Sequence, residues 1–455
     1  MRTSSNFNFH SYLRSRSSVA IFLGLALALI VGIEMPATAQ TVSSQIVITP
    51  SSTVPLLAGT TRPISNIYGN QTNPRVDCNS VSYTFDDLEG TSTIHYFDLA
   101  TGTDNIAPGN TLDRLSDIRG NRLAFTELDG TGDHIVLFDM ISHTRTVVPG
   151  DHRTFPRMGG NILTFWQFYY LSAPANDEVG IYDLITGAVT LLTNDSLPDQ
   201  FPAVSPTGNA VVWQKCLPDG LSCDIYSAIQ TSPGVFTTQG LTDASGDERQ
   251  PQTDGQIVVY TSDKSGENDI YFQPVGGGTE TRIAIPGDQR EPTISENLIS
   301  FESNQMGFYE IYVYDLSSGT LYQTTNTSMI GYDKTLNHIS VCNGTGQVVY
   351  SVPGAGAFDV YAFTFQPPDP PNGHISDLIS LVRGFGLPKG IETSLVVKLQ
   401  DAIAALNAGD TATACSALGD FINEVNAQSG KKLTVQQAEQ LVDSATAIRA
   451  LIGCG

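Results

Sequence analysis

The stretch SDKSGENDIYF, residues 262–272, lies inside a unit of residues 247–284 that is repeated along the chain. The unit consists of short apolar runs separated by polar or glycine-rich turns, at residues 257–260, 270–272 and 281–284. The next segment repeats this order, with SNQMGFYE at residues 303–310 in the place of the first hairpin. β-Branched and aromatic runs bounded by Gly, Asn and Asp are typical of strands and hairpins. Two consecutive copies therefore indicate a repeat protein built from β-strands.

The repeat extends well beyond these two copies. Its third-strand pattern, an Ile or Val followed by an aromatic residue, recurs at residues 94–98, 135–139, 179–183, 225–226, 270–271, 311–315 and 360–361. The copies begin 41 to 49 residues apart, and a period of about 40–45 residues in β sequence is typical of propeller blades with four strands each. The sequence therefore predicts an all-β, seven-bladed β-propeller over residues 73–365.

The last copy is one strand short, because residues 363–365 run directly into the proline-rich segment QPPDPPNG at 366–373. An open sheet edge leaves backbone groups unpaired. We expect an early strand at residues 54–57, within an N-terminal segment of residues 40–72, to fill this place and close the ring. Cys78 and Cys342 end the first strands of the first and seventh copies. They would then be neighbours able to form a disulfide; the alternative is free or differently paired thiols.

The other four cysteines fall into two groups. Cys216 and Cys223 flank a hairpin turn, KCLPDGLSCD, and should pair locally, whereas Cys415 and Cys454 stand alone in the C-terminal region. Six cysteines, an even number, suit a compartment that permits disulfides.

The N-terminus has the pattern of an export signal. Arg14 and Arg16 precede an apolar run at residues 19–33, and the small residues at 37–39 suit cleavage, so residues 1–39 are predicted to be a signal peptide. The alternative is an uncleaved membrane anchor, for which the run is short. We expect a secreted or periplasmic protein that does not span a membrane after cleavage. Its formal net charge of −23 argues against nucleic-acid binding.

The C-terminal part changes in composition. After a stiff proline-rich linker at 366–373, apolar residues at helical spacing predict an α-helical module over residues 374–455. Asp410 or Thr411, and Thr434, suit helix N-caps. A core of this size is marginal, so a bridge between Cys415 and Cys454 would stabilise it.

The repeats SDKSGENDIYF, SNQMGFYEIYVYDLSSGT and FPAVSPTGNAVVWQ resemble the TolB-type, WD-repeat-like propeller family. This resemblance implies a platform that binds proteins, peptides or glycans around a central channel, with catalysis supplied by an attached domain. No Gly-x-Ser-x-Gly motif of an attached hydrolase appears in this sequence. The tail from SDLISLVRGFGLPKG to SATAIRALIGC is similar to FIMAH-type helical modules of secreted bacterial proteins.

A recurring acid, usually followed by a base, occupies the turns that lead into successive copies. Its members are Asp113, Arg114, Asp151, Arg153, Asp199, Asp247, Arg249, Asp288, Arg290, Asp333 and Lys334. As a functional set they would ring one mouth of the channel as a polar ligand funnel, with arginines suited to carboxylates. The alternative is structural: each Asp caps its turn and each base pairs with the acid of the next blade.

Metal sites are a weaker hypothesis. The acidic loops at residues 86–90, 129–133 and 263–269 faintly resemble Ca²⁺ loops but lack the full pattern with its closing Glu. The histidines considered as ligands of a catalytic metal are His134, His143, His152 and His338. We predict no cofactor, with calcium as the alternative.

These patterns together predict an exported, non-enzymatic binding protein whose channel mouth takes a protein segment or a polysaccharide. The alternatives are a polysaccharide-active lyase or hydrolase and a structural component of the cell surface. The aromatic-rich insertion at residues 167–178 could add a contact surface.

Overall fold

The structure is a computed structural model that describes residues 46–49, 54–65, 67–168, 177–218, 220, 222–243, 246–325, 333–354, 357–368, 371–408 and 410–454. The predicted signal peptide lies outside the described residues, as do residues 169–176 of the aromatic insertion.

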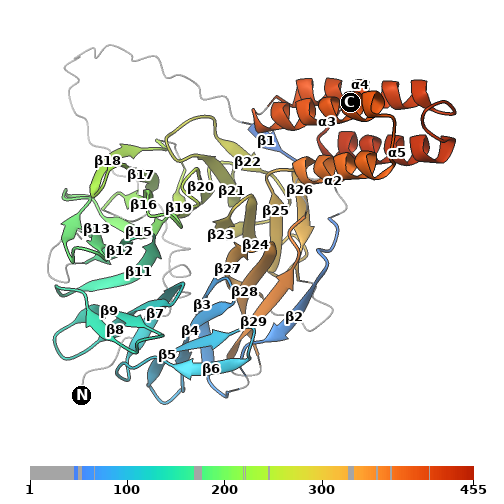
Figure 1. Cartoon of the computed structure of the whole chain (residues 1–455). Coiled ribbons are helices and arrows are strands. Elements are labelled where there is room, and N and C mark those ends of the chain that lie inside the picture. Colours follow the sequence, from blue (N-terminus) through green and yellow to red (C-terminus); the bar gives the residue numbers. More distant parts are fainter. Residues whose placement is uncertain are drawn as a thin grey trace, which may run out of the picture. The chain divides into compact units, whose positions relative to one another are not determined.

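The described strands form seven sheets arranged around a central axis (Figure 1), so the predicted seven-bladed β-propeller is confirmed. The innermost strands of blades 1 to 7 are β3 (Asn70–Asp77), β7 (Asp113–Arg119), β11 (Arg153–Gly159), β15 (Asp199–Val204), β19 (Glu248–Thr253), β23 (Gln289–Ser295) and β27 (Thr335–Cys342). The second strands are β4 (Ser80–Asp86), β8 (Arg122–Leu128), β12 (Ile162–Gln167), β16 (Ala210–Cys216), β20 (Ile257–Ser262), β24 (Leu298–Ser303) and β28 (Thr345–Pro353). The third strands are β5 (Ser92–Asp98), β9 (Asp133–Asp139), β13 (Glu178–Asp183), β17 (Cys223–Ser232), β21 (Asp269–Pro274), β25 (Glu310–Asp315) and β29 (Phe358–Phe365). The outer strands are β6 (Thr103–Ile106), β10 (Arg145–Val147), β14 (Val189–Leu191), β18 (Val235–Gly240), β22 (Thr281–Ile283), β26 (Thr320–Gln323) and β2 (Gly59–Pro63).

The core of the propeller lies between adjacent blades. For example, Ile94 of β5 packs in one cluster with Ile118, Leu123 and Phe125 of blade 2. All four side chains are buried, and apolar burial of this kind is the main stabilising contribution to folding. Each blade is therefore stable only against its neighbours, as in other repeat proteins.

The ring is closed by an N-terminal strand, but not by the predicted one. The outer strand of blade 7 is β2, which pairs antiparallel with β29 from Gly59 opposite Phe365 to Pro63 opposite Tyr361. The prediction of residues 54–57 is wrong: of these, Leu56 forms an isolated bridge with Gln323 at the edge of blade 6. The first and seventh blades also share an apolar cluster that joins Val76 to Val349.

Two disulfides join the positions in the blades that the repeat pattern predicts. Cys78 and Cys342 form a bond with their Cα atoms 5.2 Å apart, joining the ends of β3 and β27. Cys216 and Cys223 are bonded across the β16–β17 hairpin. A further strand, β1 (Ile46–Ile48), lies parallel to β22 at the outer edge of blade 5.

The C-terminal module consists of the helices α2 (Pro371–Gly384), α3 (Lys389–Asn407), α4 (Thr411–Gln428) and α5 (Val435–Leu451). The first helix begins before the predicted boundary at residue 374, with a proline at its first position, where the missing N–H costs nothing. The Asp410 carboxylate caps α4 through the Thr413 N–H at 3.0 Å. Thr434 and Gln437 form a reciprocal capping box before α5.

The module has its own core, centred on Leu399, Phe421 and Leu441. A disulfide joins Cys415 to Cys454. Across the described residues, we find no helix with the length and apolar character needed to span a membrane.

Candidate functional site

The acids of the lead-in turns, which precede the innermost strands, connect neighbouring blades. The Asp288 carboxylate, ahead of β23, accepts a hydrogen bond from the Asn268 N–H of blade 5 at 3.2 Å. The same contact is repeated from Asp333 to Tyr309, at 3.0 Å, and from Asp247 to Cys223, at 3.1 Å. These carboxylates therefore accept from the backbone next to the third strand of the preceding blade.

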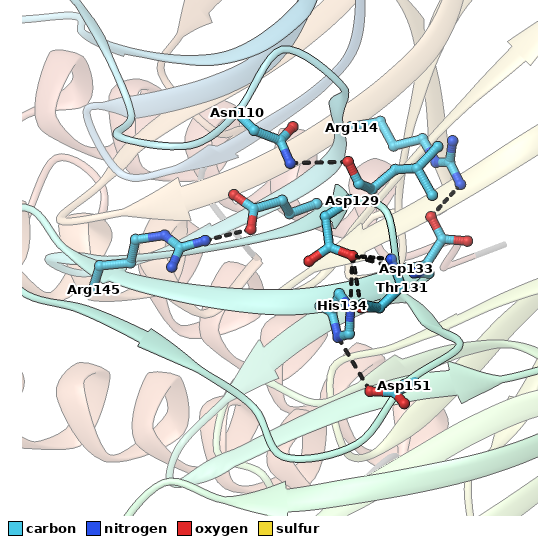
Figure 2. Close-up of polar contacts among 11 residues, drawn as sticks. Asn110, Arg114, Asp129, Thr131, Asp133, His134, Arg145 and Asp151 are labelled. Carbon is cyan, nitrogen blue, oxygen red and sulfur yellow. Dashed lines mark hydrogen bonds and ion pairs between the residues drawn. The ribbon is translucent and has the colours of Figure 1, made fainter.

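The other three acids of the predicted funnel lie in different surroundings. Asp113 and Asp199 are fully buried, and Asp199 accepts a hydrogen bond from the Trp213 indole at 2.7 Å. Burial raises the pKa of Asp113 to about 7 and that of Asp199 to about 6. Asp151 is exposed and lies 3.6 Å from His134 of blade 2 (Figure 2).

The five bases of the predicted funnel all have partners within the chain. Arg114 forms an ion pair with the buried Asp133 at 2.5 Å (Figure 2). The other contacts are Arg153 with the Gln167 side chain at 2.8 Å, Arg249 with the Gly220 carbonyl at 2.6 Å and with Asp247, Arg290 with Glu302 at 2.8 Å, and Lys334 with Glu310 at 3.1 Å. The structure thus brings the predicted residues to the starts of blades 2 to 7 and uses their charges in intramolecular contacts.

A backbone feature that the sequence reading missed recurs in every innermost strand. One residue adopts a positive φ of 51–58° where the register shifts: Asn73, Leu115, Phe155, Phe201, Gln250, Glu291 and Leu336. Non-glycine residues adopt this conformation rarely, and a bulge re-aims the side chains that follow it. Asn73, Gln250, Glu291 and Leu336 line a small cavity of about 40 Å³.

Two residues beyond the bulge, four consecutive blades place a titratable side chain at the same position of the innermost strand. They are His338 in blade 7, Arg75 in blade 1, Asp117 in blade 2 and Arg157 in blade 3. The Val76 N–H donates to His338 Nδ1 at 3.3 Å, and the Asp117 carboxylate accepts from the Met158 N–H at 2.7 Å. These contacts join blade 1 to blade 7 and blade 3 to blade 2.

Burial and the neighbouring arginines shift the pKa values of the side chains at this position of the innermost strands. Arg157 is only 6% exposed; burial and then the nearby Arg75 guanidinium hold its pKa well below the usual value. Burial, Arg75, Arg157 and Arg119 hold the pKa of His338 well below its usual value, so this imidazole is neutral at neutral pH. Burial raises the pKa of Asp117, against the attraction of Arg157 and Arg75.

A larger cavity, of about 410 Å³, lies at the end of the innermost strands where the first and second strands are joined. We call this end the hairpin face. The lining residues come from blades 1 to 4: Asp77, Arg119, Gly120, Asn121, Arg122, Met158, Gly160, Leu184 and Pro206. Arg119 forms an ion pair with Asp77 at 3.0 Å. This cavity lies at the opposite end of the strands from the predicted funnel.

The sequence contains a signal for the matching positions of Arg75 and Arg157. Pro-Arg occurs at residues 74–75 and 156–157, at the same position of two repeats. Pro follows the bulge residue in five of the seven innermost strands, at Pro74, Pro156, Pro202, Pro251 and Pro292. Aligning the repeats on this proline places the two arginines at one level.

The acidic loops considered for calcium use their carboxylates for turn geometry. Asp87 accepts from the backbone N–H groups of Glu89 and Thr91, and these bonds lower its pKa. In the second loop, hydrogen bonds from Thr131 lower the pKa of Asp129 to about 2 (Figure 2). Such Asx turns explain the residue types without a metal.

The four histidines have different contacts in the fold. His134 contacts Asp129 at 3.3 Å, His143 lies in the turn before β10, His152 packs beside Phe168, and His338 lies on the innermost strand of blade 7. Within the described ranges, no group of three His, Cys, Asp or Glu residues could hold a metal ion.

Comparison with known proteins gives a fold and no family. No protein-family profile and no curated protein matches the sequence. Among solved structures, the β-propeller domain of the Trilobed protease from Pyrococcus furiosus matches 67% of this chain and 99% of its own length, with 13% identity and a TM-score of 0.51. That propeller is described as having an open velcro topology, whereas β2 closes blade 7 here. An oligogalacturonate lyase from Vibrio parahaemolyticus matches 71% of this chain and 98% of its own, with 11% identity and a TM-score of 0.51.

Peptidases match only through part of their length. The chain spans about half of the acylaminoacyl peptidase of Pyrococcus horikoshii, 52% of that protein and 66% of this one, with 15% identity and a TM-score of 0.50. TolB from Acinetobacter baumannii is also similar, with 14% identity over 65% of this chain and 78% of its own and a TM-score of 0.37. The likeness is in the fold alone.

Proposed function

We propose that the protein is an exported binding protein that holds a segment of another protein at the hairpin face of its propeller. The observation that carries this proposal is the 410 Å³ cavity, to which four blades contribute. A concave site at the junction of several repeats is the usual form of a ligand pocket. Its volume suits a few residues of a peptide.

The composition of the cavity wall favours a protein segment over a sugar chain. Met158, Leu184 and Pro206 supply apolar surface, and Gly120 and Gly160 expose backbone. No aromatic side chain is among the lining residues of the described chain, although sugar rings are commonly bound against aromatic faces. The TolB-type resemblance of the repeats also supports a platform for protein binding.

Export is supported by the cysteine chemistry. All six cysteines are paired in disulfides, which persist in oxidising compartments. We infer that residues 1–39 direct this export and that the helical module, similar in sequence to FIMAH-type modules, accompanies the propeller outside the cytoplasm.

A matched pair of glycine variants tests the proposed site. Gly120 has a φ of 55° and open space where a Cβ would lie, so Gly120→Asn adds a side chain to the cavity in a conformation that Asn tolerates. Gly102→Asn, in the turn before β6, makes the same change at a φ of 73° away from the cavity. The tagged proteins are used to capture partners from an extract of the source cell envelope.

We expect wild type and Gly102→Asn to capture the same protein and Gly120→Asn to lose it. Equal capture by all three proteins would place binding elsewhere. Release of unsaturated products from oligogalacturonate by the purified protein would instead favour the lyase alternative.

A further inference from the structure

Blades 1, 2, 3 and 6 share one type of turn between their third and fourth strands, on the hairpin face. In each turn an Asp ends the third strand and accepts a hydrogen bond from the backbone N–H two residues later, at 2.7–3.0 Å. The residue between them is Leu or Met, packs in the core, and donates its N–H to an Asn carbonyl of the first hairpin, at 2.7–2.8 Å. The same turn geometry therefore recurs in four blades.

The next residue is the one that differs between these turns. It is Ala100 in blade 1, Ile141 in blade 2, Ile185 in blade 3 and Ser317 in blade 6. Ile141 and Ile185 are 76% and 73% exposed, which makes them the two most exposed isoleucines of the described residues. Single exposed apolar side chains are common, but Ala100 and Ser317 show that this turn forms without a large apolar group. The fold therefore does not explain the two isoleucines.

Both isoleucines adjoin the hairpin-face cavity. Ile185 directly follows Leu184, which lines the cavity. Ile141 directly follows Met140, whose backbone N–H donates at 2.8 Å to the carbonyl of Asn121, another lining residue. The two side chains therefore extend the surface of the cavity outward on two adjacent blades.

The turns that carry isoleucine belong to the blades that build the cavity. Among the described residues, all those that line it come from blades 2 and 3 except Asp77 and Pro206. Blade 6, whose turn carries Ser317, contributes no lining residue within the described chain. The exposed isoleucines thus occur where a bound segment would leave the cavity.

The charges around the cavity are balanced within the chain. Arg119 pairs with Asp77 at 3.0 Å. Arg122 lies opposite Asp139 across the β8–β9 ladder, and hydrogen bonds from Ser142 together with the nearby Arg122 charge lower the pKa of that carboxyl. Two arginines and two carboxylates leave no net charge for a ligand to complement. Apolar contacts are therefore the main source of affinity at this surface.

We infer that the partner segment is uncharged and that its apolar side chains contact Ile141 and Ile185 where the segment leaves the cavity over blades 2 and 3. Such contacts remove two exposed isoleucines from water, and that burial stabilises a complex. The inference rests on the proposed function and adds the chemistry of the segment and the residues that hold it outside the cavity.

A library of random heptapeptides displayed on phage is the probe. The library is selected on the immobilised full chain, and the readout is the composition of the enriched peptides. We expect these peptides to lack charge and to carry at least two apolar side chains. One of them is then synthesised, and its affinity for the full chain and its variants is measured by titration calorimetry.

Serine variants test the isoleucines. Ile141→Ser, Ile185→Ser and the double variant introduce the residue that Ser317 already provides in blade 6, so the turns should still form. The matched control is Ile106→Ser, because Ile106 is 61% exposed and lies at the end of β6 away from the hairpin face. We expect about a tenfold loss of affinity for each single variant, a larger loss for the double variant and none for the control. Ile141→Leu should keep most of the affinity.

Other outcomes of the selection would overturn the inference. Enrichment of acidic or basic peptides would contradict the apolar chemistry. Self-association of the full chain in size-exclusion chromatography, abolished in the double variant, would show that the partner is a second copy and not another protein.

The variant Gly120→Asn separates this inference from the proposed function. If the peptide loses affinity for Gly120→Asn but not for the double serine variant, the proposed function stands and the isoleucines play no part. A loss with the double variant alone would place binding on the turns and overturn the use of the cavity. If the peptide is affected by neither change, or if no peptide is enriched, both proposals fail.

Discussion

At the level of single residues, the propeller contains buried carboxylic acids. Asp113, Asp199, Glu248 and Glu302 are all fully buried near the starts of their blades. Burial raises the pKa of Glu248 and of Glu302 to about 7. Their folded-state pKa values exceed those of the unfolded chain, so they favour the folded state in acid. That contribution is lost as the pH rises from about 4 through about 7.

We predict that Glu248→Gln reduces this pH dependence. The Gln side chain keeps the size of the protonated acid and cannot ionise. The free energy of unfolding of wild type, relative to the variant, should fall by about 2 kcal/mol or more between about pH 5 and about pH 8. Urea unfolding of both proteins at each pH measures it. A constant difference would show that Glu248 does not titrate in this range.

The residues that the sequence could and could not predict differ in their physical role. Asp288 and Asp333 were found because several blades repeat an acidic acceptor at the lead-in turn. Arg75 and Arg157 were missed because they are not repeated in most blades, and their importance depends on which blades become neighbours in the ring. Which charged side chains lie close together in the ring depends on how the blades are assembled.

At the scale of elements, hydrophobicity alone predicts the wrong closing strand. Residues 54–57 are apolar, whereas β2 reads GTTRP and is largely exposed. An outer strand contributes mainly backbone hydrogen bonds, so it needs few apolar side chains. The open edge of blade 7 predicts that a closing strand exists. Which residues form that strand depends on the length of the connection between it and β3.

Two N-terminal truncations should separate the roles of β1 and β2. Among the described elements, a chain starting at residue 54 loses only β1 from the edge of blade 5, and it should keep the elution volume of the longer chain with nearly unchanged stability. A chain starting at residue 65 loses β2 and exposes the edge of β29. We expect it to aggregate or to unfold at a clearly lower denaturant concentration, as measured by size-exclusion chromatography and urea titration. Equal behaviour of the two chains would contradict a closing role for β2.

At the scale of the whole molecule, the ring makes distant residues neighbours. The bond between Cys78 and Cys342 spans 264 residues, whereas that between Cys216 and Cys223 spans 7. Because a cross-link restricts the unfolded chain more when its loop is longer, the two disulfides should differ in their effect on stability.

We predict that replacing both Cys78 and Cys342 with Ser lowers the free energy of unfolding by about 5 kcal/mol, against about 2 kcal/mol for the Cys216 and Cys223 pair. Denaturant unfolding of the two double variants under the same conditions measures the difference. Equal losses would mean that closure depends on β2 and blade packing alone.

The position of β2 also sets an order of events during synthesis. This strand is synthesised before the innermost strand of blade 1, and its partner β29 follows about 300 residues later. At about 5–20 residues per second, the wait is roughly 15–60 s. During that time β2 has no partner strand. A nascent chain therefore carries an unmatched edge until synthesis is nearly over, and that interval is when a chaperone that masks strands would protect it most.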